Sequence, residues 1–115
     1  MSRIRILALV AAFAALAGGA VQAAQSTDGL SRRVRVHNQT GLEIKRLQAA
    51  DVRTGQYGED LLAGAAVAAG ASRPVVVDAG NNACLFDLRA ELSSGQAVVK
   101  ENVNVCRVAD VYLTR

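Results

Sequence analysis

The chain has no tryptophan, one histidine and two cysteines among its 115 residues. Its aromatic residues are two tyrosines and two phenylalanines. These are too few rings to build a base-stacking platform for nucleic acid. One histidine and two cysteines also fail to supply the four nitrogen or sulfur ligands that a zinc ion needs. We therefore expect no nucleic-acid partner, no metal and no other cofactor.

Groups suited to nucleophilic catalysis are equally scarce. The histidine, His37, alternates with arginines on the polar face of a predicted strand. Ser72 follows a Gly-Ala pair that resembles the start of a nucleophile elbow, but Pro74 stands where that motif has its second glycine. We therefore expect no enzyme activity. A small hydrolase would require His37 to lie beside a serine or an acid in a cleft.

The N-terminus has the pattern of a secretory signal peptide: a basic start, an apolar run and a closing Val-Gln-Ala triplet. We predict a signal helix over residues 1–23, cleaved after Ala23, with Ala24 as the next candidate position. An uncleaved anchor helix is the alternative, since a bilayer span takes ~20 apolar residues. Cleavage would deliver a periplasmic or secreted protein that meets the membrane only through its signal peptide.

Removal of the signal peptide changes the charge of the chain. It carries two of the 13 basic residues and no acidic one, which leaves 11 basic and 10 acidic residues. A nearly balanced surface argues against nucleic acid as a partner. Residues 24–31 are polar and aperiodic, so we expect a flexible leader. Residues 32–115 are then a single β-domain.

Alternation of apolar and polar residues predicts about six short strands and no helix after the leader. The first strand, over residues 32–38, buries Val34 and Val36, and the second starts at Leu42. We expect these two strands to form a hairpin. The apolar positions change parity near Lys45, which predicts a β-bulge there. The spacing of the turns is typical of a small antiparallel β-sandwich or barrel.

Two features of the strands indicate sheet edges. Pro74 cannot donate a ladder hydrogen bond, so it marks the start of a strand or an edge strand. Arg32, Arg33 and Arg35 could meet an anionic partner, or they could simply discourage pairing at an edge. The closing strand, over residues 108–113, is expected to point three apolar side chains inward: Ala109, Val111 and Leu113.

The two cysteines, Cys84 and Cys106, enclose two strands and a Ser-Ser-Gly turn. Because the compartment beyond the inner membrane is oxidising, we expect one disulfide. A symmetric hairpin would bring the sulfurs together but would set Phe86 against Asn104. A one-residue shift that pairs Phe86 with Val105 suits the core better. Adjacent strands with a bulge would reconcile the two demands, and strands in facing sheets are the alternative.

The faces of these two strands follow from their alternation. Asp87 and Arg89 lie on the polar face, where they can interact with Lys100 and Glu101 across the hairpin. The residues expected to point inward are Phe86, Leu88, Ala90 and Leu92 on the first strand and Val99, Val103 and Val105 on the second.

Four short motifs occur in order along the chain. They are Asn-x-Thr-Gly from Asn38, aromatic-Gly-x-Asp-x-Leu from Tyr57, Val-x-x-Gly-x-Ser from Val67 and Cys-x-Phe-Asp-x-Arg from Cys84. Together they resemble a family of small exported bacterial proteins of unknown function. The resemblance covers about residues 33–106 and implies a disulfide-bonded β-domain without an established activity. One position departs from the family pattern, which usually has tryptophan in place of Tyr57.

We therefore expect a non-catalytic domain that binds a protein or an envelope component. The alternative is a small-ligand or carbohydrate-binding module centred on Tyr57, Glu59 and Asp60. Asp87 and Arg89 are further candidate binding residues. A purely structural role competes with both, because Tyr57 could cover one end of the sandwich and Asp60 could cap a turn.

Overall fold

The structure, a computed structural model, describes residues 25–115. Six β-strands and no helix are found in this part of the chain. The strands are β1 (Arg33–Gln39), β2 (Ile44–Asp51), β3 (Ser72–Val76), β4 (Leu85–Leu92), β5 (Ala97–Asn104) and β6 (Asp110–Thr114). The predicted signal helix and its cleavage position lie outside the described residues.

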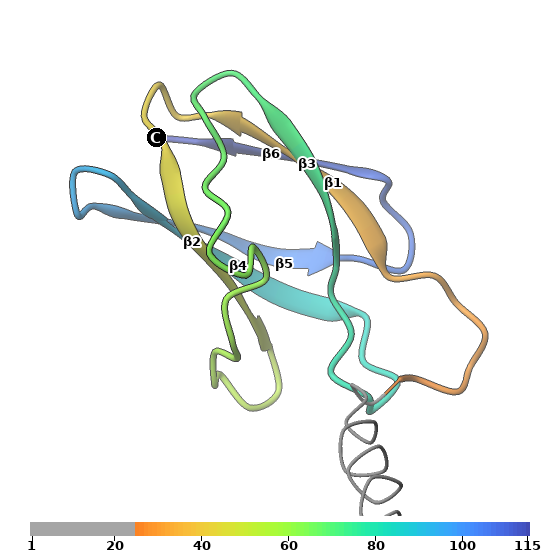
Figure 1. Ribbon diagram of the computed structural model, residues 1–115. Helices are drawn as coiled ribbons and strands as arrows, with labels where there is room; N and C mark the ends of the chain where they lie inside the picture. Colours follow the sequence, from red (N-terminus) through yellow and green to blue (C-terminus); the bar gives the residue numbers. More distant parts are fainter. Residues whose placement is uncertain (1–24) are drawn as a thin grey trace, which may run out of the picture.

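The strands form two three-stranded sheets, ordered β3-β1-β6 and β2-β4-β5, that face each other across one core (Figure 1). The prediction of a small all-β sandwich with six strands is therefore confirmed. Three of the four described strand pairs are antiparallel, and β1 and β6 run parallel. The alternation pattern did not predict the parallel pair, because it indicates which face is buried and not which strand lies alongside.

The turn after β1 does not close a hairpin, contrary to the prediction, because β1 and β2 belong to different sheets. Asn38 at this turn is fully buried. Its side-chain amide donates to the carbonyls of Leu42, Val67 and Ala68 at 2.7, 3.0 and 3.1 Å. The Thr40 hydroxyl donates to Asn38 Oδ1 at 2.7 Å. These bonds tie the turn after β1 to Val67 and Ala68, and the chain crosses to the other sheet at this point.

The predicted core is largely confirmed. The β-bulge near Lys45 is present, because the β2–β4 register shifts between Ile44 and Arg46. Ala109 is exposed, contrary to prediction, since it lies in the loop before β6. The buried core consists of Val34, Val36, Ile44, Leu47, Leu62, Val67, Val75, Val77, Ala83, Phe86, Leu88, Ala90, Leu92, Val103, Val105, Val111 and Leu113.

The two cysteines flank the hairpin of β4 and β5. Cys84 and Cys106 form the predicted disulfide, with their Cα atoms 5.3 Å apart. A bulge interrupts the β4–β5 register after Phe86, which confirms adjacent strands with a bulge over facing sheets. The shift runs in the direction opposite to the predicted one, because Phe86 pairs with Val103 and not with Val105.

The bulge lies on β5, where Glu101 and Asn102 oppose Asp87. Asn102 adopts a left-handed backbone conformation, with φ of 53°, and donates its N–H to Asp87 Oδ1 at 2.9 Å. The extra residue reverses the faces of β5 on its N-terminal side. Val99 is therefore 50% exposed, contrary to prediction, and Val98 packs against the core in its place.

The two long sides of the sandwich differ in how they are sealed. On the side formed by β5 and β6, here the closed side, Lys100 Nζ donates to the carbonyl of Tyr112 at 3.3 Å. On the opposite side, here the open side, β2 and β3 are the edge strands. Residues 52–71, here the cover, run along the edge of β2. They form isolated bridges with it, such as Ile44–Val67. Pro74 lies in β3, which confirms its prediction as an edge residue.

Candidate functional site

The aromatic-Gly-x-Asp-x-Leu motif runs beside β2 as a short extended segment. Tyr57 forms an isolated bridge with Ala50 of β2. Further along, the Gly58 N–H donates to the Ala49 carbonyl at 3.1 Å, and Leu61 also bonds to β2 through its N–H. The motif is therefore part of the cover on the open side, and its side chains occupy fixed places relative to β2.

Asp60 is committed to holding this cover in place. Its carboxylate accepts backbone N–H bonds from Leu47 and Leu62 at 3.0 Å and from Gly64 at 3.1 Å. Burial disfavours the charged form of Asp60, but the three N–H donors outweigh it and keep its pKa below the ordinary value. Both carboxylate oxygens are occupied, so the structural interpretation of Asp60 has more support than a ligand role.

Three predicted site residues meet on the outer face of the β2-β4-β5 sheet. The Arg89 guanidinium lies over the Tyr57 ring, 5.8 Å from its centroid. Burial raises the pKa of the Tyr57 phenol and so does the nearby charge of Asp87, while Arg89 opposes the shift. The alternation of side chains along β2 places Ala50 on this outer face. Ala50 is nevertheless only 2% exposed, which fits a position beneath the Tyr57 ring. The cluster therefore covers a sheet surface and does not enclose a cavity.

A groove of about 640 Å³ lies on the open side of the sandwich. Residues 58–61 form one wall, residues 76–79 form the other, and residues of the segment 25–30 line one end. Ala49 and Phe86 also line it. The structure thus places Glu59 and Asp60 at the groove and Tyr57, Asp87 and Arg89 outside its lining.

The groove is mostly apolar but carries acidic groups. Leu30 and Val76 line it and remain 53% and 54% exposed. Asp78 accepts hydrogen bonds from the Ser26 N–H at 3.0 Å and the Ser26 hydroxyl at 2.6 Å. Burial opposes its ionisation, but these bonds keep the pKa of Asp78 below its ordinary value. Within residues 25–115, no hydrogen bond engages the carboxylate of Glu59, which is exposed at the groove.

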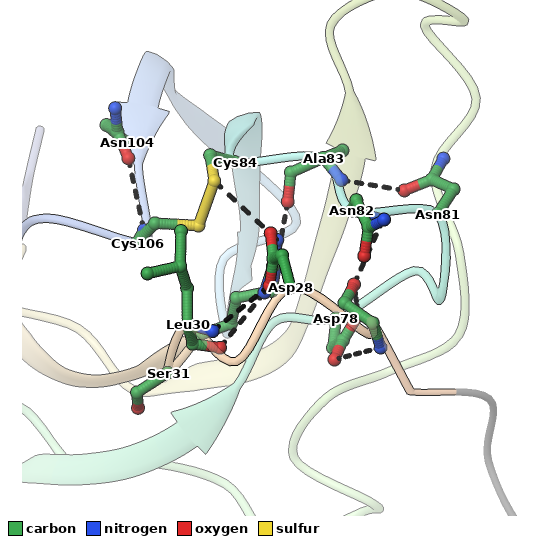
Figure 2. Close-up of a disulfide and its surroundings, with 12 residues drawn as sticks. Asp28, Leu30, Ser31, Asp78, Asn81, Asn82, Ala83, Cys84, Asn104 and Cys106 are labelled. Atoms are coloured by element: carbon green, nitrogen blue, oxygen red, sulfur yellow. Dashed lines mark hydrogen bonds and ion pairs between the residues drawn. A yellow bond between two sulfur atoms is a disulfide. The ribbon is translucent and has the colours of Figure 1, made fainter.

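The segment predicted to be a flexible leader is tied to the end of the sandwich (Figure 2). Arg32 is buried and donates to the Ala83 carbonyl at 2.8 Å and to both carboxylate oxygens of Asp28 at 2.9 and 2.7 Å. The hydrogen bond from Arg32 lowers the pKa of Asp28 to about 2. Arg32 therefore cannot join Arg33 and Arg35 in an exposed basic surface. The sequence carried no signal for this ion pair beyond its four-residue spacing.

His37 lies on the outer face of the β3-β1-β6 sheet. Its Nε2 is 2.8 Å from Asp110 Oδ1, and its ring stacks on Tyr112 with the centroids 4.5 Å apart. Ser72 is the register partner of His37, but its hydroxyl accepts a hydrogen bond from Arg35. An acid is within hydrogen-bond distance of His37, and the three cavities described for residues 25–115 do not include its ring.

The described part of the chain, residues 25–115, holds neither a cluster of metal ligands nor a membrane-spanning helix. No three histidine, cysteine, aspartate or glutamate side chains there lie close enough together to hold a metal ion. No helix there has the length and apolar character to cross a membrane.

Comparison with known proteins gives one partial structural likeness. No family model and no curated protein matches the chain. The NMR structure of a protein from Eubacterium rectale superposes with a TM-score of 0.48 and 18% sequence identity, over 77% of this chain and 81% of that chain. At this level the likeness carries no argument about function, which has to come from the geometry of the groove itself.

Proposed function

We propose that this protein is an exported, non-catalytic β-domain that binds another protein or an envelope component through the open-side groove. The groove is the observation that carries the proposal. It combines the exposed side chain of Leu30 and an apolar lining that includes Leu61 and Phe86 with one carboxylate, Glu59, that is not used to hold the fold. Exposed apolar side chains around a concave surface are typical of interaction sites.

The acidic groups at the groove support binding over catalysis. Asp60 and Asp78 are held by hydrogen bonds from the protein, and their pKa values are lowered. A general acid or base works best when its pKa is near the working pH. Strongly ionised carboxylates with several N–H partners are therefore poor candidates for proton transfer.

Export is supported by the disulfide and by the N-terminal sequence pattern. A bond between Cys84 and Cys106 is typical of proteins in oxidising compartments. The motifs that carry the family resemblance fall mainly on architectural residues, such as Asn38 at the corner and Asp87 at the bulge. We therefore take the resemblance as support for a shared fold and make no claim about a shared ligand.

The carbohydrate-binding alternative has less support. Such a module would use the face of Tyr57 as a stacking platform. The Arg89 guanidinium already lies over that ring, and Tyr57 does not line the groove that contains Glu59.

The proposal is tested by capture from the native envelope. The full chain, its Glu59→Lys variant and its Glu43→Lys variant are immobilised without reductant and incubated with envelope extract. Glu43 is an exposed glutamate outside the groove, so its variant controls for the charge change. We expect wild type and Glu43→Lys to retain the same component and Glu59→Lys to retain about tenfold less, equivalent to 1.4 kcal/mol. Equal retention by all three proteins would contradict a role for the groove.

A further inference from the structure

We propose that the occupant of the groove is an extended segment of a partner protein, rich in alkyl and basic side chains, that adds as a strand along the free edge of β3. This inference rests on the proposed function and specifies the chemistry of the partner. Strand addition of this kind draws affinity from backbone hydrogen bonds and specificity from alternate side chains.

The backbone of β3 supplies the first argument. The Val77 N–H donates to the Arg32 carbonyl at 2.9 Å, so the backbone groups of odd-numbered residues in this stretch point towards β1 and those of even-numbered residues point away. Val76 therefore presents its N–H and carbonyl at the free edge. Within residues 25–115, no backbone hydrogen bond engages either group. Unpaired groups at an edge are a template for another strand.

Pro74 limits where that strand can pair. It has the same parity as Val76, so the N–H that proline lacks would have pointed to the free edge. The remaining N–H donors at this edge of β3 belong to Ser72 and Val76, on either side of the proline. Val76 is the one beside the groove, because residues 76–79 form its wall. Pairing is therefore directed to the end of β3 that borders the groove.

The side chains of an added strand would alternate between the groove and the outer surface. Val75 and Val77 point into the core, so the matching side chains of the added strand would point into the groove. They would meet an apolar surface that includes Phe86 and Leu61. Its volume of about 640 Å³ lies within the range of about 300–1,000 Å³ typical of ligand sites. Alkyl side chains suit this surface.

Charge distinguishes a basic partner from a second copy of the same chain. Glu59, Asp60 and Asp78 place three carboxylates around the groove. Two copies joined through β3 would bring their own acidic grooves together, and like charges disfavour that contact. A lysine or arginine on the added strand would instead pair with Glu59, the carboxylate that the fold leaves unengaged.

The test is an NMR titration of the full chain, kept oxidised, with the capped peptide Ser-Val-Thr-Lys-Thr-Val-Ser. We expect saturable binding with Kd below about 1 mM. The Val76 amide should exchange its hydrogen at least about tenfold more slowly when the peptide is bound. The Val77 amide is the internal control, because its hydrogen is already bonded to Arg32.

Two control peptides separate strand addition from adhesion to an apolar surface. The same peptide with alternate backbone nitrogens methylated cannot form the strand bonds and should not bind. A peptide with glutamate in place of lysine should bind at least about tenfold more weakly to wild type, and Glu59→Lys should reverse that preference. Glu43→Lys should leave it unchanged.

Several results would overturn the inference. These are equal binding of the methylated peptide, shifts that map away from β3, failure of all the peptides to bind, or dimers of the free chain that pair through β3. If no peptide binds while Glu59→Lys still abolishes capture from the envelope, strand addition is wrong and the proposed function stands. If both tests fail, the groove is not a binding site.

Discussion

On the closed side of the sandwich, β5 and β6 bring the sheets together and leave a cavity of only about 90 Å³ between them. On the open side, the groove between β3 and the cover of β2 measures about 640 Å³. Side chains bonded to backbone, above all Asn38 and Asp60, hold that cover in place. The domain keeps a hollow on one side because Asp60 accepts a hydrogen bond from the Leu47 N–H, at an edge of β2 that a further strand would have paired.

The most damaging change to the open side should be Asn38→Ala. It removes a fully buried side chain that makes five hydrogen bonds, three to carbonyls and two from Thr40, and it leaves a cavity and a Thr40 N–H without its acceptor. We expect the free energy of unfolding to fall by about 4 kcal/mol. Urea denaturation at pH 7 measures this loss.

Asn104→Ala is the matched control on the closed side. Asn104 Oδ1 accepts one hydrogen bond, from the Cys106 N–H at 3.1 Å, and we expect a loss of about 1 kcal/mol. Equal losses in the two variants would show that the open side does not depend on its buried amide.

The next largest loss of stability should come from removing the disulfide that links the ends of the β4–β5 hairpin. Cys84→Ser removes a crosslink between residues 22 positions apart and should cost the oxidised domain about 3 kcal/mol. The melting temperature of the variant reports the loss. Wild type in reductant should melt at the same temperature as the variant. An unchanged melting temperature after substitution would show that the sulfurs are not bonded in the protein.

Two neighbouring acidic residues offer a sharper test of the cover. Asp60→Ala deletes a carboxylate that accepts three backbone N–H bonds and should lower the free energy of unfolding by about 2 kcal/mol. Glu59→Ala removes an exposed carboxylate and should change it by less than about 0.5 kcal/mol. Paired urea denaturation curves at pH 7 compare them. A larger loss from Glu59→Ala would reverse the roles assigned to the two residues.

The smallest expected effect is a pH dependence of the free energy of unfolding, caused by the ion pair of Asp28 and Arg32. The hydrogen bond from the Arg32 guanidinium lowers the folded-state pKa of Asp28 to about 2, below its ordinary value of 3.8. The stability that this pair contributes is therefore fully present above about pH 4 and is lost as the pH falls towards 2. The urea midpoint of wild type should exceed that of Asp28→Asn at pH 6, and the gap should narrow between pH 4 and 2. A constant gap would contradict the ion pair.

The sequence predicted the faces of the strands better than their neighbours. Period-two alternation identified the buried valines of β1 and the bulge near Lys45, and the two cysteines of a chain expected to be exported predicted the disulfide. The alternation could not reveal that Asn38 bonds across 29 positions to Val67, or that the chain crosses between sheets at this turn in place of the expected hairpin. Likewise, alternation could not show that the bulge lies on β5 and not on β4. The bulge is at Asn102, which adopts a left-handed backbone conformation.

The site was predicted only in part. Glu59 and Asp60 were identified and do lie at the groove, but Asp60 is used to hold the cover. Leu30 and Val76 were missed, because the exposure of an apolar residue depends on which strand lies beside it. The one local signal for the free edge was Pro74, two residues before Val76.

We propose that the open side of the sandwich, and not the closed side, meets a partner. The most direct test of this proposal is photo-crosslinking in the native cell, with a benzophenone side chain placed at Glu59 in one protein and at Val99 in another. Both positions are exposed, and Val99 lies on β5 at the closed side. We expect a discrete adduct from position 59 and none from position 99. An adduct from position 99 alone would contradict it.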